Sequence, residues 1–382
     1  MAEVHLLHLT ASASLSWRGL VFLSLIWALI EKRDWGWLKP LWCWLLVLGI
    51  WLAWAAAGLA LAAFPKAGYF YYARLIELGL LAVCLARLGQ DPRLAKVAFK
   101  GLGIGLLVAA VFCIYQFIAG DFFFGIAKTT MPGAGYLIRE PMGFFRTGGT
   151  FTDPNNMAAV FSLALLVMLW QKSGQLGFGR QSFLVGLYYL GLLFTLGRSV
   201  WFGLLVGVWP VFKGRSLRLK AVAVILVLIG IFWTSLARWD MPRPEKISPY
   251  TSTTSRLVYW REALRMSLEN PLFGVGLKNY HYHFVANLGA RPLKDLKVLK
   301  AEPHGLFWGL AAETGLVGLG LFVVLAGWPL WRNLRKLDDW NRLSLSLGLF
   351  VLVHGAAHNY LYQELLWTVI GFCAGAAWVN DA

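Results

Sequence analysis

Charged side chains are scarce in this sequence. Only 14% of its 382 residues are Asp, Glu, Lys or Arg, and acidic residues are the fewer, 19 against 35 basic ones. A soluble protein of this length would carry about 25% charged residues, so the composition argues against an ordinary soluble chain. The four cysteines stand singly within apolar runs. Such spacing is typical of small core residues, and it argues against a disulfide framework or a metal cluster.

Apolar runs of about twenty residues take the place of the missing charge. Hydrophobic residues make up 58% of the chain, which includes 20 Trp, and the mean hydropathy is +0.61. The runs do not alternate between apolar and polar residues, as the strands of a membrane barrel would. We therefore predict an all-α polytopic membrane protein, one integral membrane domain over 1–382 with about 11 (11–12) transmembrane helices. The expected spans are 12–31, 40–64, 70–87, 97–118, 156–171, 183–197, 199–212, 219–236, 304–330, 341–360 and 364–380.

The basic residues gather in every second loop between these spans. Lys213 and Arg215 follow the seventh span, for example, and Arg332, Arg335 and Lys336 follow the ninth. Loops rich in Lys and Arg face the cytoplasm in membrane proteins, so we expect the C-terminus in the cytoplasm. The formal charge of +16 is explained by this pattern, and no nucleic-acid partner is expected.

Two of the opposite, outer loops are long, at 119–155 and 237–303. Chemistry in the aqueous phase is expected in these loops, because the other connections are short. The second loop contains an amphipathic helix at about 255–268, between a Ser/Thr cluster and an Asn-Pro stop signal. Five apolar residues share one face of this helix: Leu257, Trp260, Ala263, Leu264 and Leu268.

Three basic residues at the outer surface are candidates for a functional site. Arg256 falls among the apolar residues of the amphipathic helix and needs an anionic partner, although a snorkelling side chain or a pair with Glu262 or Glu269 would also explain it. Arg198 joins two apolar runs, where an arginine marks a site or anchors a helix end to lipid phosphate. His304 opens the ninth span, where a histidine can also be purely structural.

Other polar residues give weaker signals. His354 and His358 are four residues apart in the tenth span, but without a third ligand they favour core hydrogen bonds over a zinc site. The carboxylates of the long loop form no tight pair for magnesium, so neither metal nor cofactor is expected. Arg146 adds a further outer cation, and Glu313 lies inside an apolar run without an evident role.

Four motifs follow one another between about 140 and 375. They are "GTFTDPNNMA" (149–158), "GRSVW" (197–201), "SRLVYWREAL" with "NPLFGVGLKNY" (255–280), and a stretch in which His304 precedes Gly315 and Gly318. In this order they resemble the superfamily of O-antigen ligases and O-antigen polymerases, bacterial membrane enzymes that take glycans from a polyprenyl pyrophosphate carrier. The superfamily has Asn, Ser or Gln after the histidine, and this chain has Gly305.

The resemblance implies a fold like that of metal-independent GT-C-like membrane glycosyltransferases and an inverting glycosyl transfer without a cofactor. His304 would be the general base for an acceptor hydroxyl, because an imidazole ordinarily titrates near neutral pH. Arg198 and Arg256 would bind the pyrophosphate and stabilise it as it leaves. Support for the site is expected from Glu313, Arg146, Gly315 and Gly318.

The expected donor is a glycan on undecaprenyl pyrophosphate, and the expected acceptor is lipid A–core, as in lipopolysaccharide biosynthesis. A polymerase that passes the glycan to a second lipid-linked repeat, or an enzyme that glycosylates protein, would need the same groups. The resemblance places the chain among membrane lipids in the bacterial inner membrane, part of the cell envelope, with its active site facing the periplasm. A membrane transporter is the main rival from another class, but the polar outliers gather at the outer face and not at mid-membrane.

Overall fold

The computed structural model describes residues 36–120, 138–139, 145–148, 153–171, 179–214, 217–237, 252–287 and 302–379. These residues are helical apart from turns, loops and one antiparallel pair of short strands, β1 (Ile138–Arg139) and β2 (Phe145–Arg146). The helices are η1 (Gly36–Leu41, 3-10), α2 (Trp42–Ala60), α3 (Pro65–Gln90), α4 (Pro92–Ala119), α5 (Pro154–Gln171), α6 (Arg180–Phe194), α7 (Ser199–Phe212), α8 (Leu217–Leu236), α9 (Ser252–Glu269), α10 (Tyr280–Asn287), α11 (Leu306–Lys336), α12 (Asp339–Gly355) and α13 (Glu364–Ala377).

Ten of the predicted spans coincide with helices, from 40–64 with α2 to 364–380 with α13. The span predicted at 12–31 lies outside the described residues. Within the described residues, five helical segments are long and apolar enough to cross a membrane: Gly36–Ala60, Pro65–Gln90, Pro92–Ala119, Pro154–Gln171 and Leu306–Lys336. These segments support the polytopic helical class. The count of about 11 spans and the sides of the loops stay predictions.

Local sequence explains how one of these helices begins and ends. Asp91 precedes α4, and its carboxylate accepts the backbone N–H groups of Arg93 and Leu94 at 2.9 and 3.1 Å. Pro92 occupies the first helical position, where its missing N–H costs nothing. Gly120 ends the helix in the left-handed conformation at φ 67.

The described residues group into two compact units. Unit 1 takes in the described parts of Asp91–Pro242 and Asp338–Phe350, and unit 2 those of Trp37–Gln90, Arg243–Leu337 and Val351–Ala382. The prediction of one integral membrane domain over 1–382 stays a prediction.

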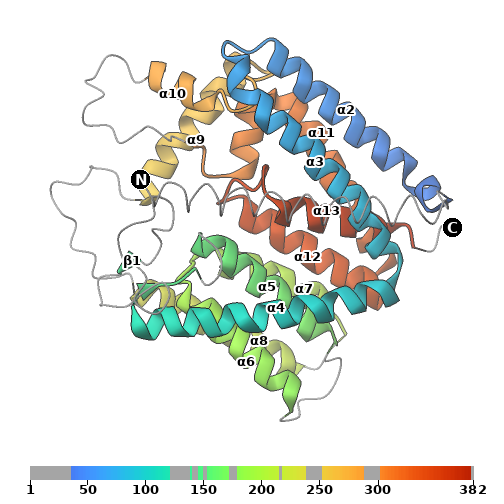
Figure 1. Ribbon diagram of the computed structural model, residues 1–382, viewed down its shortest axis with the longest axis vertical. Helices are drawn as coiled ribbons and strands as arrows, with labels where there is room; N and C mark the ends of the chain where they lie inside the picture. The colour runs from blue at the N-terminus through green and yellow to red at the C-terminus, as the bar shows by residue number, and fades with distance from the viewer. Residues whose placement is uncertain are drawn as a thin grey trace, which may run out of the picture. The chain divides into compact units, whose positions relative to one another are not determined.

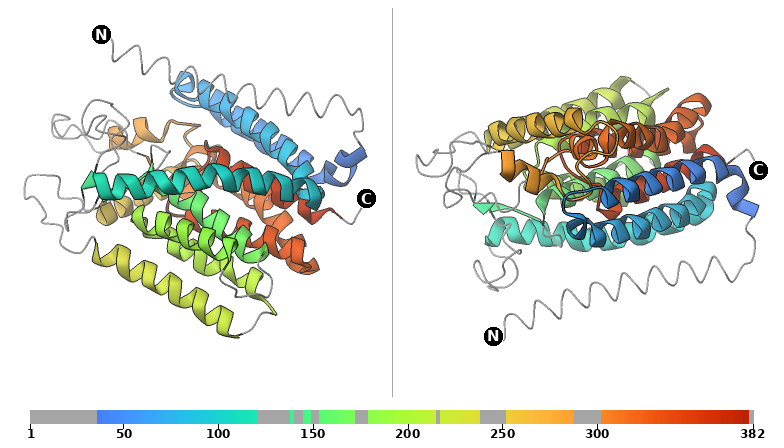
Figure 2. Two further views of the ribbon diagram at one scale, coloured as in Figure 1. Left: turned by 60° about the horizontal axis from the view of Figure 1, so that its bottom comes forward. Right: turned by 90° about the horizontal axis from the view of Figure 1, so that it is seen from above.

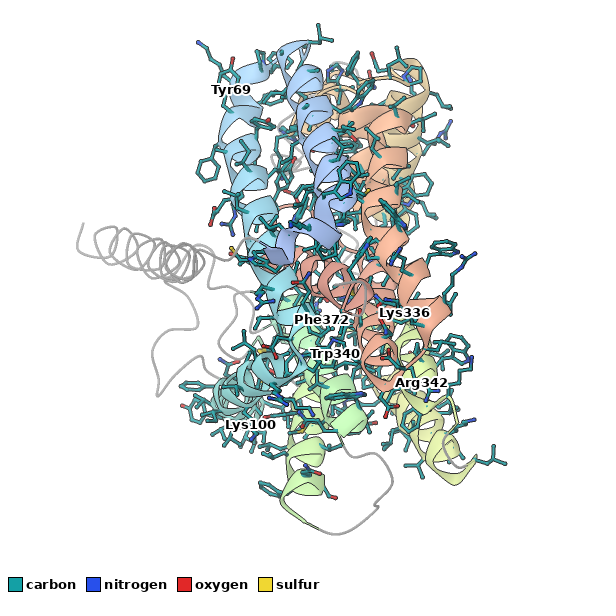
Figure 3. The ribbon with its side chains drawn as sticks, turned by 90° about the vertical axis from the view of Figure 1, so that its right-hand side faces the viewer. Tyr69, Lys100, Lys336, Trp340, Arg342 and Phe372 are labelled. Atoms are coloured by element: carbon teal, nitrogen blue, oxygen red, sulfur yellow. The ribbon has the colours of Figure 1, made fainter. Side chains whose placement is uncertain are left out.

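In unit 2, α2 and α3 run side by side (Figure 1), and α13 packs closely on α3. Small residues permit this approach, because Gly371 and Gly375 of α13 face Ala82 and Ala86 of α3. The indole of Trp44 on α2 donates to the carbonyl of Leu325 at 3.0 Å and ties α2 to α11. Figure 3 shows Tyr69 near one end of α3 and Lys336 toward the opposite end of this unit.

In unit 1, α4 and α5 pack on α6, and α7 packs on α5 and α8 (Figure 2). The hydroxyl of Tyr188 on α6 donates to the carbonyl of Gly103 on α4 at 2.7 Å. The hydroxyl of Ser346 on α12 donates to the carbonyl of Gly207 on α7. Both bonds join helices at buried or half-buried positions, where a polar group needs a partner.

Candidate functional site

His304 lies in the turn that precedes α11. Its φ is 44, a left-handed conformation that is uncommon for a residue with a side chain, and its side chain is exposed. The imidazole ring contacts the ring of Tyr259 on α9, with 5.4 Å between the centroids. α9, from the loop predicted to be outer, and the turn before α11 therefore meet at this histidine.

A helix, α9 (Ser252–Glu269), lies where the amphipathic helix is predicted at about 255–268. Its leucines are exposed, however, and α9 packs on α10 and α11 through Ala263 and Met266. The hydroxyl of Tyr280 on α10 donates to the carbonyl of Tyr259 at 2.8 Å, and burial raises the pKa of both phenols. Periodicity locates such a helix, but it does not distinguish its protein-facing side from an equally apolar outward side.

Arg256 is half-buried and lies one helical turn before Trp260. The Trp260 ring stacks on the Trp308 ring of α11, with 5.8 Å between the centroids. Glu269, one of the alternative partners for Arg256, pairs with Arg265 at 2.7 Å. Arg256 thus stands on the part of α9 that faces the beginning of α11, in the same unit as His304.

Gly305 is held close to the connection between α12 and α13. A Cβ atom at this position would lie 2.7 Å from the carbonyl oxygen of Ala356 and 3.0 Å from the ring of Trp308. An Asn, Ser or Gln side chain would require that backbone to move. The departure from the superfamily pattern is therefore built into the packing of this chain.

His354 lies at the end of α12, and His358, expected in the same span, lies in the turn after that helix. The hydroxyl of Tyr360 lies 2.8 Å from Nδ1 of the buried His354, and the ring of His358 lies 4.7 Å from the His354 ring. Arg256 also interacts electrostatically with His354. In the described ranges no group of three or more His, Cys, Asp or Glu side chains has the arrangement of a metal site.

Gly315 breaks α11 about ten residues after its start. Its φ of 74 and ψ of 177 are accessible essentially to glycine alone. The N–H of Leu316 leaves the helical pattern and donates to the carbonyl of Pro271 at 2.8 Å. A Cβ atom on Gly315 would lie 2.3 Å from the carbonyl oxygen of Leu272. The "PLFGVG" segment, which follows α9, is therefore in direct backbone contact with the break.

This segment also binds the carbonyl groups that the break releases. The N–H of Val275 donates to Ala312 at 2.8 Å, and the N–H of Gly276 donates to Glu313 at 3.1 Å. A broken helix is tolerated at membrane depth only where other groups satisfy its backbone. The "PLFGVG" motif of the loop and the motif around Gly315 in α11 thus bind each other through their backbones.

Tryptophans of α2 complete the hydrogen bonding around the break. The indole of Trp54 lies within hydrogen-bonding distance of the carbonyl of Thr314 at 3.2 Å. The indole of Trp51 donates to the carbonyl of Gly318 at 3.1 Å. Gly318 also allows the helix to approach Trp54, whose ring carbon would lie 3.3 Å from an added Cβ. Gly315 and Gly318 therefore support the architecture around the site.

Glu313 points into a buried polar cluster. Its side chain is 3% exposed, and it accepts a hydrogen bond from the hydroxyl of Tyr362 at 2.9 Å. The ammonium of Lys278, at the end of the docked segment, interacts with Glu313 electrostatically and pairs with Glu302 at 2.9 Å. Tyr71 of α3 and Tyr362 place their rings 4.7 and 4.9 Å from this ammonium.

Lys278, Tyr362 and Tyr71 were not predicted from the sequence. The available signal was weak, because a lysine two residues after "PLFGVG" looks like an ordinary loop cation. Its partners come from α3 and from the connection between α12 and α13, and no spacing in the sequence brings these segments together.

Arg146 organises the turn that carries Arg198 in unit 1. The Arg146 side chain is buried, and its guanidinium donates to the carbonyl of Thr195 at 2.8 Å and to Asn155 at 2.6 Å. The Asn155 amide in turn donates to Asp153 at 3.0 Å. Arg146 therefore links the motif at 149–158 to the turn that precedes the motif at 197–201.

Arg198 is exposed and stands at the N-cap of α7, directly after Leu196, which has a positive φ of 50, and Gly197. Arg198 belongs to unit 1, whereas Arg256 and His304 belong to unit 2. Their convergence on one substrate stays a prediction.

Two comparisons with known proteins show what the chain is similar to. Residues 157–323 match the model of the family described as O-antigen ligase. A probable peptidoglycan glycosyltransferase, FtsW, from Alkalilimnicola ehrlichii is 29% identical over 204 residues, which are 53% of this chain and 42% of that protein. The chain thus matches less than half the length of this relative. The resemblance to O-antigen ligases is confirmed over 157–323, a segment that includes Arg198, Arg256, His304, Glu313, Gly315 and Gly318.

Proposed function

We propose that the chain is a membrane glycosyltransferase of the O-antigen ligase type. The observation that carries the proposal is the placement of His304, exposed at the start of α11 in a left-handed turn and in contact with the helix that carries Arg256. The family match covers this region. The relative from Alkalilimnicola ehrlichii is itself named a probable glycosyltransferase, which supports the same class of reaction.

In the proposed reaction, an acceptor sugar hydroxyl attacks the anomeric carbon of a glycan linked to undecaprenyl pyrophosphate. The new carbon–oxygen bond forms as the bond to the pyrophosphate breaks, with inversion. The hydroxyl proton passes to His304, and the pyrophosphate keeps the bonding electrons. General-base assistance of this kind typically contributes about 10²–10⁴ in rate.

The leaving pyrophosphate gains negative charge during the reaction, and guanidinium groups stabilise such charge with paired hydrogen bonds. We assign this role to Arg198 and Arg256. The first stands at a helix N-terminus, where the helix dipole also favours an anion. Arg146 supports the turn that carries Arg198, and Glu313 supports the segment that docks on α11.

We further propose that the protein lies in the bacterial inner membrane, that its site faces the periplasm, and that lipid A–core is the acceptor. Transfer to a second lipid-linked repeat or to protein would use the same base and the same arginines. The choice of acceptor depends on the outer loops, and the sequence motifs do not indicate which acceptor these loops bind.

The test is a competition assay with purified protein and a lipid-linked oligosaccharide. Lipid A–core and a second lipid-linked repeat are offered together, and the products are separated by mass. A product on lipid A–core supports the ligase. A product only on the lipid-linked repeat would replace it with a polymerase, and solute flux in proteoliposomes without any transfer would favour a transporter.

A further inference from the structure

Lys278 is a largely buried cation at the centre of the polar cluster formed with Glu313, Tyr362, Tyr71 and Glu302. Its side chain is 18% exposed, and its Nζ lies 2.9 Å from Oε1 of Glu302. Burial lowers the pKa of this ammonium, but the carboxylates of Glu313 and Glu302 outweigh burial, and the pKa ends above its ordinary value. Lys278 therefore stays charged at any pH at which the protein is expected to work.

The backbone of Lys278 is held firmly. It follows the segment whose N–H groups bind the broken turn of α11, and it has a positive φ of 57. On its other side, the amide of Asn279 donates to the carbonyl of Phe64 at 3.2 Å, while the N–H of Phe64 donates to Asn279 at 2.9 Å. Hydrogen bonds to α11 on one side and to the loop that precedes α3 on the other therefore fix the backbone on both sides of Lys278.

Glu302, the partner of Lys278, stands two residues before His304. Pro303 lies between them, is buried, and packs near Gly309 of α11. His304 keeps a left-handed backbone that L-residues avoid unless their surroundings impose it. On the far side of the histidine, Gly305 is confined by the carbonyl of Ala356. On the N-terminal side of His304, the ion pair between Lys278 and Glu302 holds the chain.

We propose that Lys278 is a positioning residue for His304, acting through Glu302 to hold the left-handed turn from which the imidazole projects. This inference rests on the proposed function, in which His304 is the general base. A base that is misplaced by about 1 Å can lose 10²-fold in rate, so an anchor two residues away affects kcat without touching the substrate. Glu313 and Tyr362 gain a role as well, since they fix the lysine from the other side.

The competing role for Lys278 is direct binding of the donor pyrophosphate. The two roles differ in what the partner substitution does. If the ammonium binds the pyrophosphate, Glu302→Gln should leave the affinity for the donor intact or improve it. If Lys278 positions His304, Glu302→Gln and Lys278→Met should have the same effect, and the double variant should be no worse than either single one.

The experiment compares Lys278→Met, Lys278→Arg, Glu302→Gln and the Lys278→Met/Glu302→Gln double variant with the wild type. The matched control is Arg265→Met, which removes an exposed pair from α9. We expect kcat for glycan transfer to fall by about 10- to 100-fold in the Met and Gln variants, with KM for the donor unchanged. Lys278→Arg should keep most of the activity, and Arg265→Met should match the wild type.

A second measurement reports on His304 without glycan transfer. Diethylpyrocarbonate labels imidazoles, and the labelled peptides are quantified by mass spectrometry with His281 of α10 as the internal reference. We expect the ratio of labelling at His304 to that at His281 to change in Lys278→Met and in Glu302→Gln, but not in Arg265→Met.

Unchanged kcat and an unchanged labelling ratio would overturn the positioning role. A large rise in KM for the donor in Lys278→Met alone would also overturn it and would favour direct binding. If the wild type transfers no glycan, the proposed function fails, while the labelling ratio still decides whether Lys278 holds His304. Size-exclusion profiles of each variant in detergent show that the folded protein is being compared.

Discussion

The Gly315→Ala substitution tests the broken helix. It puts a methyl group on a residue with φ 74 and ψ 177, where a residue with a side chain is strained by about 1–3 kcal/mol. The added Cβ would also lie 2.3 Å from the carbonyl oxygen of Leu272 and 2.7 Å from that of Pro271. Overpacking of this kind costs about 1–3 kcal/mol. Together the substitution should destabilise the fold by about 2–6 kcal/mol.

The matched control is Gly320→Ala in the same helix. An added Cβ there meets no atom within 4 Å, and alanine is favoured over glycine within a helix by about 1 kcal/mol. The assay measures the fraction of protein that stays monodisperse in detergent after heating, by fluorescence-detected size exclusion. Gly315→Ala should lower the Tm by at least about 3 °C, and Gly320→Ala should leave it unchanged or raise it. Equal Tm values for the two variants would refute the account of the break at Gly315.

Three further predictions follow from single contacts. Gly305→Asn, which restores a residue usual in the superfamily, should lower and not raise glycan transfer, because its Cβ meets the carbonyl of Ala356; a gain in the transfer assay would contradict this packing. Arg146→Ala removes the charged hydrogen bond to Thr195 and should cost about 1.5–3 kcal/mol, read as a lower Tm. The pKa of Lys278 lies above 10.5 in the folded protein, so its stabilisation is present below about pH 10.5 and is lost as the pH rises through the folded pKa. Between about pH 9 and 12 the wild-type Tm should fall more steeply than that of Lys278→Met, and parallel curves would count against the pair.

Helix positions were predictable from the sequence because apolar runs and their stop signals are local. The span predicted at 199–212 has the same bounds as α7, and the amphipathic helix appears as α9. The break at Gly315 was not predictable, because glycines are frequent in membrane helices and the predicted span 304–330 ran straight through it. Only the docking of "PLFGVG" shows why this glycine differs from Gly320.

The sequence named the candidate site as a set of residues, whose roles stay predictions, but it did not yield the geometry. Arg198, Arg256 and His304 were expected to approach one surface. Tyr259 of α9, the helix that carries Arg256, contacts His304, and the approach of Arg198 stays a prediction. The role of Glu313 could not be derived, because its partners, Tyr362 and Lys278, come from other segments. Long-range pairs of this kind depend on how the helices pack, and no residue spacing in a single sequence identifies them.

The most direct test of the proposed function follows both products of one reaction in proteoliposomes. Purified protein is given undecaprenyl-pyrophosphate-linked glycan and lipid A–core, and glycosylated lipid A–core and free undecaprenyl pyrophosphate are measured together. The proposed mechanism predicts equal amounts of both from the wild type and neither from His304→Ala at the same level of folded protein. Full production of both by His304→Ala, or release of undecaprenyl pyrophosphate without a glycosylated acceptor, would contradict it.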